Sequence, residues 1–270
     1  MEMRINEAGE MRDLNIRIGE ELKKHPEKRI FWFIYEGRKI WVKQTESVRN
    51  ERWLRFARCA CLVLGLGILQ PGVNPNGKKA LHFETGRLDR LARRGVGVPE
   101  VYASGDGWLA LADCGARVSE LVGRADVPFS QKEEMLSSGA EDLARLHALG
   151  LHHGRPALKD MMWDGTRVML IDFEDGILIG LPREKRILRD VLLFVQSIFK
   201  EAGADADRLA ETVFRVYAGR QPHYAARACT YFGRLDALYL VLKIFLRHTG
   251  SDLESVYRTL AFFRSGGDGR

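Results

Sequence analysis

The alternation of apolar and polar positions predicts strands in the first half of the chain. Residues 30–35 (IFWFIY) and 39–44 (KIWVKQ) are rich in aromatic and β-branched side chains, which favour extended structure. A short polar segment containing Gly37 separates the two runs. Because glycine takes a positive φ at no steric cost, the pattern predicts a β-hairpin. Residues 101–103 and 108–112 predict two further short strands.

Helical periodicity governs most of the remaining chain. Leu81, Leu88 and Leu91 lie at helical spacing and predict a helix over residues 80–94, which ends at Gly95. The second half is expected to be helical, apart from a strand pair around residues 167–173. Its expected helices cover residues 134–149, 190–200, 207–217 and 224–247. Upstream, a helix is expected over residues 47–64 and a loop over residues 72–79.

Strands followed by helices are typical of an α+β protein, here with a small sheet lobe and a larger helical lobe. The expected division is residues 1–115 for the first lobe and 116–265 for the second. A glycine-rich tail, residues 266–270, is expected to be disordered. No period of about 20–50 residues repeats, which excludes a solenoid.

Composition and charge narrow the class of protein without naming a partner. Of the 270 residues, 46% are hydrophobic and 29% charged, which excludes disordered, collagen-like and disulfide-rich chains. The formal net charge of +6 favours acidic partners, such as nucleotides, nucleic acid, phosphorylated glycans or an anionic membrane. The four cysteines lack the spacing of zinc ligands, and reduced thiols fit the cytoplasm.

Location follows from the apolar segments. The N-terminus has no apolar core of the kind that a signal sequence carries. The longest apolar run, residues 59–69, is shorter than the ~20 residues that a membrane span needs. We therefore expect a cytoplasmic protein without a transmembrane helix.

Two carboxylates flank one predicted hairpin and carry the most informative chemistry. Asp172 directly follows an apolar strand, which holds its side chain rigidly, and Asp160 lies twelve positions earlier on the loop that enters the same hairpin. Two carboxylates brought together in this way can hold Mg²⁺ against the oxygens of a triphosphate. The sequence therefore predicts a magnesium–nucleotide site.

The order of residues around these acids resembles a known superfamily. His153 precedes Asp160 by seven residues, and residues 171–174 read IDFE. This arrangement resembles the catalytic loop, H-x-D-x-x-x-x-N, and the D-F-G metal motif of the protein-kinase-like superfamily. The LHALGLHHG lead-in most resembles bacterial lipopolysaccharide-core (Kdo/heptose) kinases and aminoglycoside-phosphotransferase-like kinases. The resemblance covers roughly residues 30–200 and implies a bilobal kinase-like fold that uses ATP and Mg²⁺ to phosphorylate a sugar hydroxyl.

Upstream residues fall in the order that this resemblance implies. Lys43 is similar to the strand lysine that binds the α- and β-phosphates, and Glu84 to its acidic partner on the following helix. Residues 108–115 are similar to the strand and hinge that receive adenine, which makes Asp113 a nucleotide-binding candidate. Asp190 resembles the buried acid that steadies the catalytic loop, and His153 is expected to be structural, whereas His147 and His152 are expected to have no chemical role.

Three departures from the superfamily pattern bear on activity. Arg155 stands where the catalytic aspartate is usual, and Asp160 replaces the usual asparagine. No glycine-rich phosphate loop precedes the hairpin, since residues 16–25 offer only Gly19. We expect Asp160 to bind Mg²⁺ and to be a candidate general base, with Arg155 and Lys159 contacting phosphate. A pseudokinase that binds nucleotide or a partner without transfer is the main rival hypothesis.

A protein kinase, a nucleic-acid partner and a membrane contact have less support in the sequence. A protein Ser/Thr kinase commonly has a lysine two residues after its catalytic aspartate, and that position is Ala157 here. No aromatic–basic motif or zinc finger indicates a nucleic-acid partner. In residues 47–69 a basic stripe lies beside an apolar one, and such a segment can contact an anionic membrane at the inner face of the cytoplasmic membrane. We favour a helix packed on the small lobe with its arginines extended to solvent. The stripe consists of Arg49, Arg52, Arg55 and Arg58.

Overall fold

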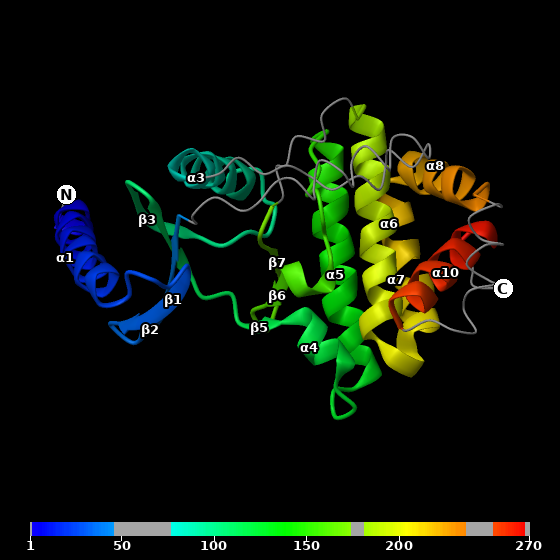
Figure 1. Ribbon diagram of the computed structural model, residues 1–270, viewed down its shortest axis with the longest axis horizontal. Coiled ribbons are helices and arrows are strands. Elements are labelled where there is room, and N and C mark those ends of the chain that lie inside the picture. Colours follow the sequence, from blue (N-terminus) through cyan, green and yellow to red (C-terminus); the bar gives the residue numbers. More distant parts are fainter. Residues whose placement is uncertain (1, 46–76, 174–180, 236–250, 268–270) are drawn as a thin grey trace. The chain divides into compact units, whose positions relative to one another are not determined.

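The computed structural model describes residues 2–45, 77–173, 181–235 and 251–267 (Figure 1). They belong to a mixed α+β fold with small antiparallel sheets and a mostly helical remainder. The described chain divides into two compact units, the first ending at Cys114 and the second beginning at Gly115. The segment of the predicted helix over residues 47–64, with its basic stripe, lies outside the described residues.

The first unit is built on a four-stranded antiparallel sheet with the order β1-β2-β4-β3. Glu36 and Gly37 connect β1 and β2 with φ values of 49° and 74°, and two positive φ angles in a two-residue loop define a type I′ hairpin. The hairpin predicted from the sequence is therefore confirmed. The strands are β1 (Ile30–Tyr35), β2 (Arg38–Gln44), β3 (Val101–Gly105) and β4 (Trp108–Ala112).

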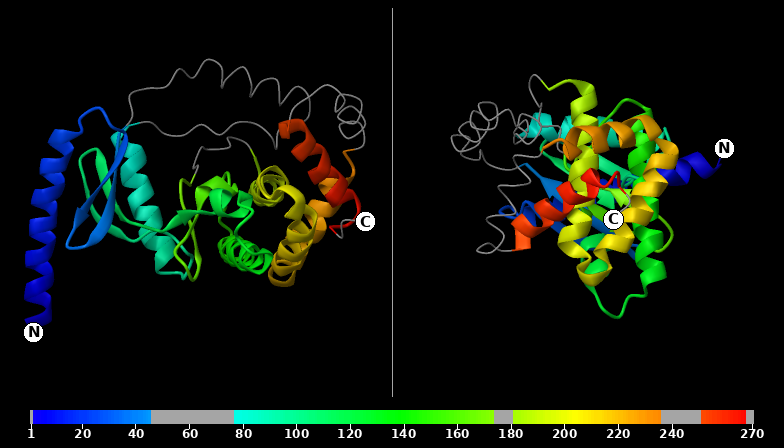
Figure 2. Two further views of the ribbon diagram at one scale, coloured as in Figure 1. Left: turned by 90° about the horizontal axis from the view of Figure 1, so that it is seen from below. Right: turned by 90° about the vertical axis from the view of Figure 1, so that its right-hand side faces the viewer.

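Two helices flank this sheet on opposite faces (Figure 2). Helix α3 (Lys78–Ala92) takes the place of the helix expected over residues 80–94 and buries the three leucines that predicted it. It begins two residues earlier than expected, so the end of the loop expected over residues 72–79 is helical; residues 72–76 lie outside the described chain.

Helix α1 (Glu2–Lys24) was not predicted. It packs Leu14 and Ile18 against the face of the sheet that carries Phe31 and Val42. Charged residues surround these few apolar positions, so the amphipathic signal is weak in the sequence. Gly19 lies inside α1, where no phosphate-binding loop can form.

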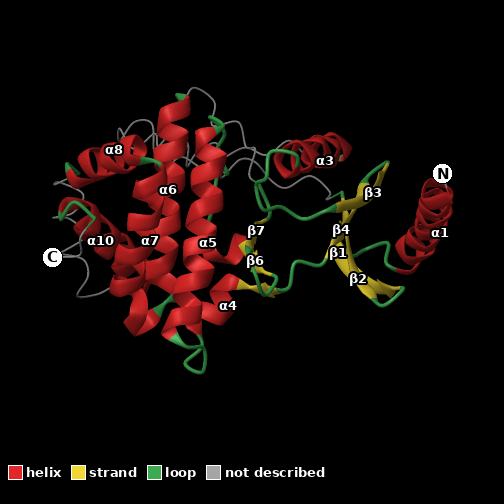
Figure 3. Cartoon of the chain, turned by 180° about the vertical axis from the view of Figure 1, so that it is seen from behind, coloured by secondary structure: helices red, strands yellow, loops and turns green. Residues whose placement is uncertain are grey.

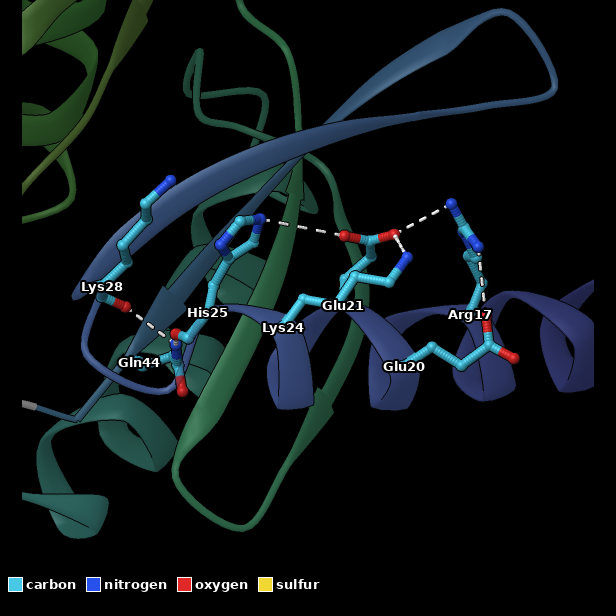
Figure 4. Close-up of polar contacts among 7 residues, drawn as sticks. All are labelled: Arg17, Glu20, Glu21, Lys24, His25, Lys28 and Gln44. Carbon is cyan, nitrogen blue, oxygen red and sulfur yellow. Dashed lines mark hydrogen bonds and ion pairs between the residues drawn. The ribbon is translucent and has the colours of Figure 1, made fainter.

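Polar contacts fix the C-terminal end of α1 to the end of β2 (Figure 4). The buried Glu21 carboxylate accepts ion pairs from Arg17 and Lys24, each at 2.8 Å. The hydrogen bond from Lys24 lowers the pKa of Glu21 against the opposing effect of burial. The Gln44 side-chain amide donates to the backbone carbonyls of His25 at 2.9 Å and Lys28 at 2.8 Å. The residue that follows Lys43 is thereby held in place.

The second unit combines a small sheet with a bundle of helices (Figure 3). Its sheet has the order β5-β6-β7, and the β6–β7 hairpin is the expected strand pair, although its first strand lies before the expected range of residues 167–173. The strands are β5 (Ala116–Arg117), β6 (Met161–Trp163) and β7 (Val168–Leu170). The helices are α4 (Val118–Gly123), α5 (Phe129–Ala148), α6 (Arg183–Glu201), α7 (Ala206–Arg220), α8 (Pro222–Gly233) and α10 (Ser251–Arg264), with short 3₁₀ turns η2 (Leu158–Asp160) and η3 (Gly203–Asp205).

Three of the four helices expected in this half are confirmed, each longer than predicted. The helix expected over residues 224–247 is confirmed in its first part only, and residues 236–247 lie outside the described chain. Helix α8 ends at Gly233, and Leu235 is no longer helical. A Cβ at Gly233 would lie 3.2 Å from the carbonyl oxygen of Phe263, so α10 approaches the backbone where α8 ends. A larger residue at this position would push the two backbones apart by a few tenths of an ångström, and the apolar periodicity of the sequence does not reveal this close approach.

The residues that follow α10 cap its C-terminal end. The backbone N–H groups of Gly266 and Gly267 donate to the carbonyls of Phe263 and Phe262 at 3.2 and 3.0 Å. Gly267 is buried against the Phe214 ring. The first two residues of the expected disordered tail are therefore part of a helix cap. Among the helices of the described residues, none is long and apolar enough to cross a membrane.

Candidate functional site

Lys43 and Glu84 form an ion pair within the first unit. The Lys43 ammonium lies 2.8 and 2.9 Å from the two carboxylate oxygens of Glu84 on α3. The two side chains are 17% and 18% exposed, so water screens the pair only partly. Lys43 is held in extended backbone between two neighbouring strands, since it pairs with Ile30 on β1 and Leu109 on β4. This is the pairing that the resemblance implied.

Asp113 is bonded to side chains of the same sheet. Its Oδ1 accepts the Trp41 indole N–H at 2.6 Å and the Lys39 ammonium at 3.0 Å. The Lys39 ammonium also lies 4.5 Å from the centre of the Trp41 ring. Because side chains alternate along a strand, Lys39, Trp41 and Lys43 share one face of β2. Trp41, which was not predicted from the sequence as a site residue, thus lies on the face that carries Lys43.

In the second unit one guanidinium joins the two predicted metal ligands. Asp160 ends η2, and Asp172 lies two residues beyond the end of β7. Arg155 Nε is 3.2 Å from Asp160 Oδ2, and Arg155 Nη2 is 3.4 Å from Asp172 Oδ2. The Ile171 backbone N–H donates to the Asp160 carbonyl at 3.0 Å, which ties the entry of the hairpin to its exit. The hairpin thus places Asp160 and Asp172 beside one positively charged group, the guanidinium of Arg155.

Asp172 has an uncommon backbone conformation. Its φ of 54° lies in the left-handed region, which costs most side chains about 1 kcal/mol or more and which aspartate tolerates better. Strain of this kind clusters at ligand sites. The side chain is 45% exposed, whereas that of Asp160 is 7% exposed. Lys159, beside Asp160 in the sequence, has an exposed side chain on η2.

The donor set of this cluster suits one class of metal. Within the described chain no group of three or more His, Cys, Asp and Glu residues could hold an ion, so Asp160 and Asp172 would be two protein ligands among waters and ligand oxygens. Mg²⁺ is commonly held in this way, by one or two carboxylates together with substrate phosphates. The two acids fit Mg²⁺ bound with a nucleotide and do not resemble a zinc site.

A buried hydrogen-bond chain supports the loop that carries Arg155. Asp190 on α6 accepts the backbone N–H groups of His153 and Gly154, the latter at 2.9 Å. His147 Nε2 lies 3.3 Å from Asp190, and its Nδ1 lies 2.7 Å from the Tyr217 hydroxyl. The imidazole can donate from Nε2 to Asp190 while Nδ1 shares a hydrogen bond with the Tyr217 hydroxyl, which satisfies both contacts. We call Asp190, His147 and Tyr217 the buried brace.

Charge and burial set the pKa values within the buried brace. Burial alone would raise the pKa of Asp190, but the hydrogen bond and positive potential from His147, together with His153 and His152, lower it overall. Burial, followed by the Asp190 charge, raises the pKa of Tyr217. Asp190 is therefore ionised and Tyr217 neutral at pH 7.

The parts played by His147 and Tyr217 were not predicted from the sequence. His147 was expected to have no chemical role, and it is a structural member of the buried brace. A polar residue on the apolar face of α5 was the available signal, but its partners lie 43 and 70 positions away. His153, expected to be structural, is fully buried, and its ring stacks on Phe173 with centroids 4.4 Å apart.

Comparison with known proteins adds a relative without a known activity. No family model matches the chain. An uncharacterized protein from Haemophilus influenzae is 29% identical to it over 246 residues, which cover 89% of this chain and 91% of that protein. The similarity extends over nearly all of both chains, but that relative is uncharacterized. Any activity of the present chain must therefore be argued from the geometry of its own residues.

Proposed function

We propose that this protein is an ATP- and Mg²⁺-dependent phosphotransferase with a protein-kinase-like fold. The observation that carries the proposal is that one hairpin brings Asp160 and Asp172 to the same cationic group, as a site for one divalent ion requires. The ion pair between Lys43 and Glu84 supports it, because such a pair presents an ammonium group for phosphate oxygens.

The side chains divide the work in the following way. Lys43, held by Glu84, binds the α- and β-phosphates, while Asp160 and Asp172 would hold a metal ion that would supply neutralisation of phosphate charge. Arg155 contacts the transferred phosphoryl group, for which its planar fork is suited. Lys159 and Asp113 are further nucleotide contacts in this proposal. They are assigned by their place in the sequence pattern.

The acceptor is an alcohol, which we propose to be a sugar hydroxyl of a lipopolysaccharide-type glycan or another small molecule. The acceptor oxygen forms a bond to the γ-phosphorus while the bond to the bridging β,γ-oxygen breaks and ADP leaves. The hydroxyl proton passes to a carboxylate, for which Asp160 is the candidate. Positioning and electrostatics supply most of the rate in such a reaction.

A second candidate function is a nucleotide-binding pseudokinase. It is favoured by Arg155, which stands in place of the usual catalytic aspartate and pairs with both metal-site acids. Binding without transfer would leave the contacts of Lys43, Asp160 and Asp172 unchanged. A phosphotransfer assay with glycan acceptors separates the two functions once nucleotide binding is established.

Thermal stability with and without Mg·ATP tests the nucleotide site. A ligand at 100 times its Kd adds about 2.7 kcal/mol to the free energy of unfolding and raises the Tm. We expect a metal-dependent rise in wild type and none in Asp172→Asn, because asparagine tolerates the left-handed backbone but removes the charge. Asp126→Asn is the matched control, since Asp126 pairs with Arg124 on the exposed surface.

The control should keep the full rise in Tm. An absent shift in wild type at millimolar Mg·ATP, or an undiminished shift in Asp172→Asn, would overturn the proposed site. A metal-dependent shift without phosphotransfer to any alcohol acceptor would favour the pseudokinase.

A further inference from the structure

Arg155 contacts one oxygen atom of each carboxylate that would bind a metal ion. Its guanidinium reaches Oδ2 of Asp160 through Nε at 3.2 Å and Oδ2 of Asp172 through Nη2 at 3.4 Å. A bound Mg²⁺ would lie about 2.0–2.1 Å from carboxylate oxygens, well inside the distance at which the guanidinium sits. Mg²⁺ and the guanidinium would repel each other across so short a distance. The two cations therefore compete for the same pair of acids.

The two carboxylates differ in how much they need a cation. The Asp160 side chain is 7% exposed and has little water to compensate its charge, whereas that of Asp172 is 45% exposed. Two like charges on one hairpin also repel each other. Arg155, itself 31% exposed, relieves both costs, and it is open enough to solvent to leave when another anion is offered.

The sum of charges explains why the ligand should arrive as a complex. Asp160 and Asp172 with Arg155 carry a net charge of about −1, which a divalent ion would change to about +1. A site with a net positive charge is unfavourable for a bare ion and favourable for an ion that brings phosphate oxygens. The phosphate also gives the displaced guanidinium a new partner.

We propose that Arg155 is the resident counter-ion of Asp160 and Asp172. It pairs with one oxygen of each carboxylate until a metal–nucleotide complex displaces it onto phosphate. This inference rests on the proposed function for the identity of the ligand, but the competition between Arg155 and a divalent ion does not. The consequence is selectivity, because the site responds weakly to metal alone and strongly to metal with nucleotide.

Binding of Mn²⁺ without nucleotide tests the competition directly. Mn²⁺ replaces Mg²⁺ at oxygen sites, and the electron paramagnetic resonance signal of the free ion reports how much is bound. We expect Arg155→Gln to bind Mn²⁺ at least about tenfold more tightly than wild type, since the substitution removes one positive charge that repels the ion and competes for the two carboxylates. Arg124→Gln, which removes an exposed arginine paired with Asp126, should bind like wild type.

A second substitution assigns the gain to this site. Adding Asp172→Asn to Arg155→Gln should abolish the tighter binding. If Arg155→Gln does not fold, as judged by a cooperative melting transition, Arg155→Lys takes its place. Lysine keeps the charge but lacks the fork that reaches both acids, so a smaller gain in Mn²⁺ affinity is expected. Equal or weaker Mn²⁺ binding in the folded variant overturns the inference.

The Mg·ATP melting experiment on wild type distinguishes this inference from the proposed function. A wild-type shift with Mg·ATP, but no gain of Mn²⁺ affinity in the Arg155 variant, removes the counter-ion role and leaves the nucleotide site. A gain of Mn²⁺ affinity that depends on Asp172, without any shift by Mg·ATP, supports the counter-ion role and removes the proposed function.

Discussion

Two neighbouring parts of one loop are held in different ways. The backbone of His153 and Gly154 is fixed by the buried brace, whose Asp190 is 0% exposed. The next residue, Arg155, is 31% exposed and reaches its carboxylates at 3.2 and 3.4 Å. Helix α6 also binds the loop through a second residue, because Arg189 Nε donates to the Gly154 carbonyl at 3.2 Å.

The difference separates stability from ligand response. A buried carboxylate that accepts two backbone N–H groups gains strong hydrogen bonds, and any loss leaves desolvated groups without partners. An exposed ion pair contributes about 0–1 kcal/mol and rearranges easily. The buried brace should therefore determine whether the loop keeps its shape. The ion pairs of Arg155 with Asp160 and Asp172 should determine which ligand binds at the loop.

The largest expected effect tests the buried brace alone. Asp190→Ala removes the acceptor of two backbone N–H groups and of His147, so we expect the free energy of unfolding to fall by about 3–5 kcal/mol. Urea denaturation followed by circular dichroism measures the loss. Arg155→Gln serves as the comparison within the same loop, with a smaller expected loss, because Arg155 and Asp172 are partly exposed and only Asp160 is buried. Similar losses in both variants would contradict the separation.

A smaller expected effect concerns how the free energy of unfolding depends on pH in the acidic range. The folded-state pKa of Asp190 is lowered from its ordinary value of 3.8, so the ionised form stabilises the fold. A group with a depressed pKa contributes stability that is present above the unfolded pKa and is lost as the pH falls through the folded pKa. We expect wild type to exceed Asp190→Asn by about 2 kcal/mol in the free energy of unfolding at pH 7.

That difference should stay constant down to about pH 5 and shrink below the ordinary pKa of 3.8. Unfolding of both variants by urea over this pH range provides the measurement. Glu21 and Asp164, whose pKa values are also lowered, are present in both variants and cancel in the difference. A difference that grows as the pH falls would show that the brace works through a neutral Asp190.

Much of this arrangement was accessible from the sequence because it depends on local pattern. Alternation along two strands and a glycine between them predicted the β1–β2 hairpin, and leucine spacing predicted α3. The superfamily resemblance indicated Lys43 and Glu84, and the hairpin pattern indicated Asp160 and Asp172; the structure joins these candidates as two ion-paired groups. Local order is sufficient where the partners lie on adjoining elements.

The rest depended on contacts between distant positions. The Tyr217 hydroxyl reaches His147 across 70 positions, and no spacing rule predicts such a pair. Helix α8 ends where α10 approaches Gly233, which apolar periodicity cannot reveal. The sequence indicated that Arg155 replaces a catalytic aspartate, but only the geometry reveals that its side chain spans both acids.

The smallest expected effect asks whether the two parts of the loop are coupled. Phe173 stacks on the His153 ring with centroids 4.4 Å apart and an interplanar angle of 26°, and it directly follows Asp172. Its side chain therefore connects the braced backbone to Asp172, one of the two proposed metal ligands. Phe173→Leu should lower the free energy of unfolding by about 1 kcal/mol, the usual size of an aromatic pair contribution.

Coupling between the two parts of the loop should also change the response of Phe173→Leu to Mg·ATP. If the stacked ring positions Asp172, the rise in Tm with Mg·ATP should be smaller in Phe173→Leu than in wild type, although not abolished. Phe262→Leu is the matched control, because Phe262 packs on Phe199 and Phe214 in the helical core and should lose stability without losing the Mg·ATP response. An undiminished response in Phe173→Leu would mean that Asp172 is positioned by the strand β7 that precedes it. The buried brace and the ion pairs of Arg155 would then act independently.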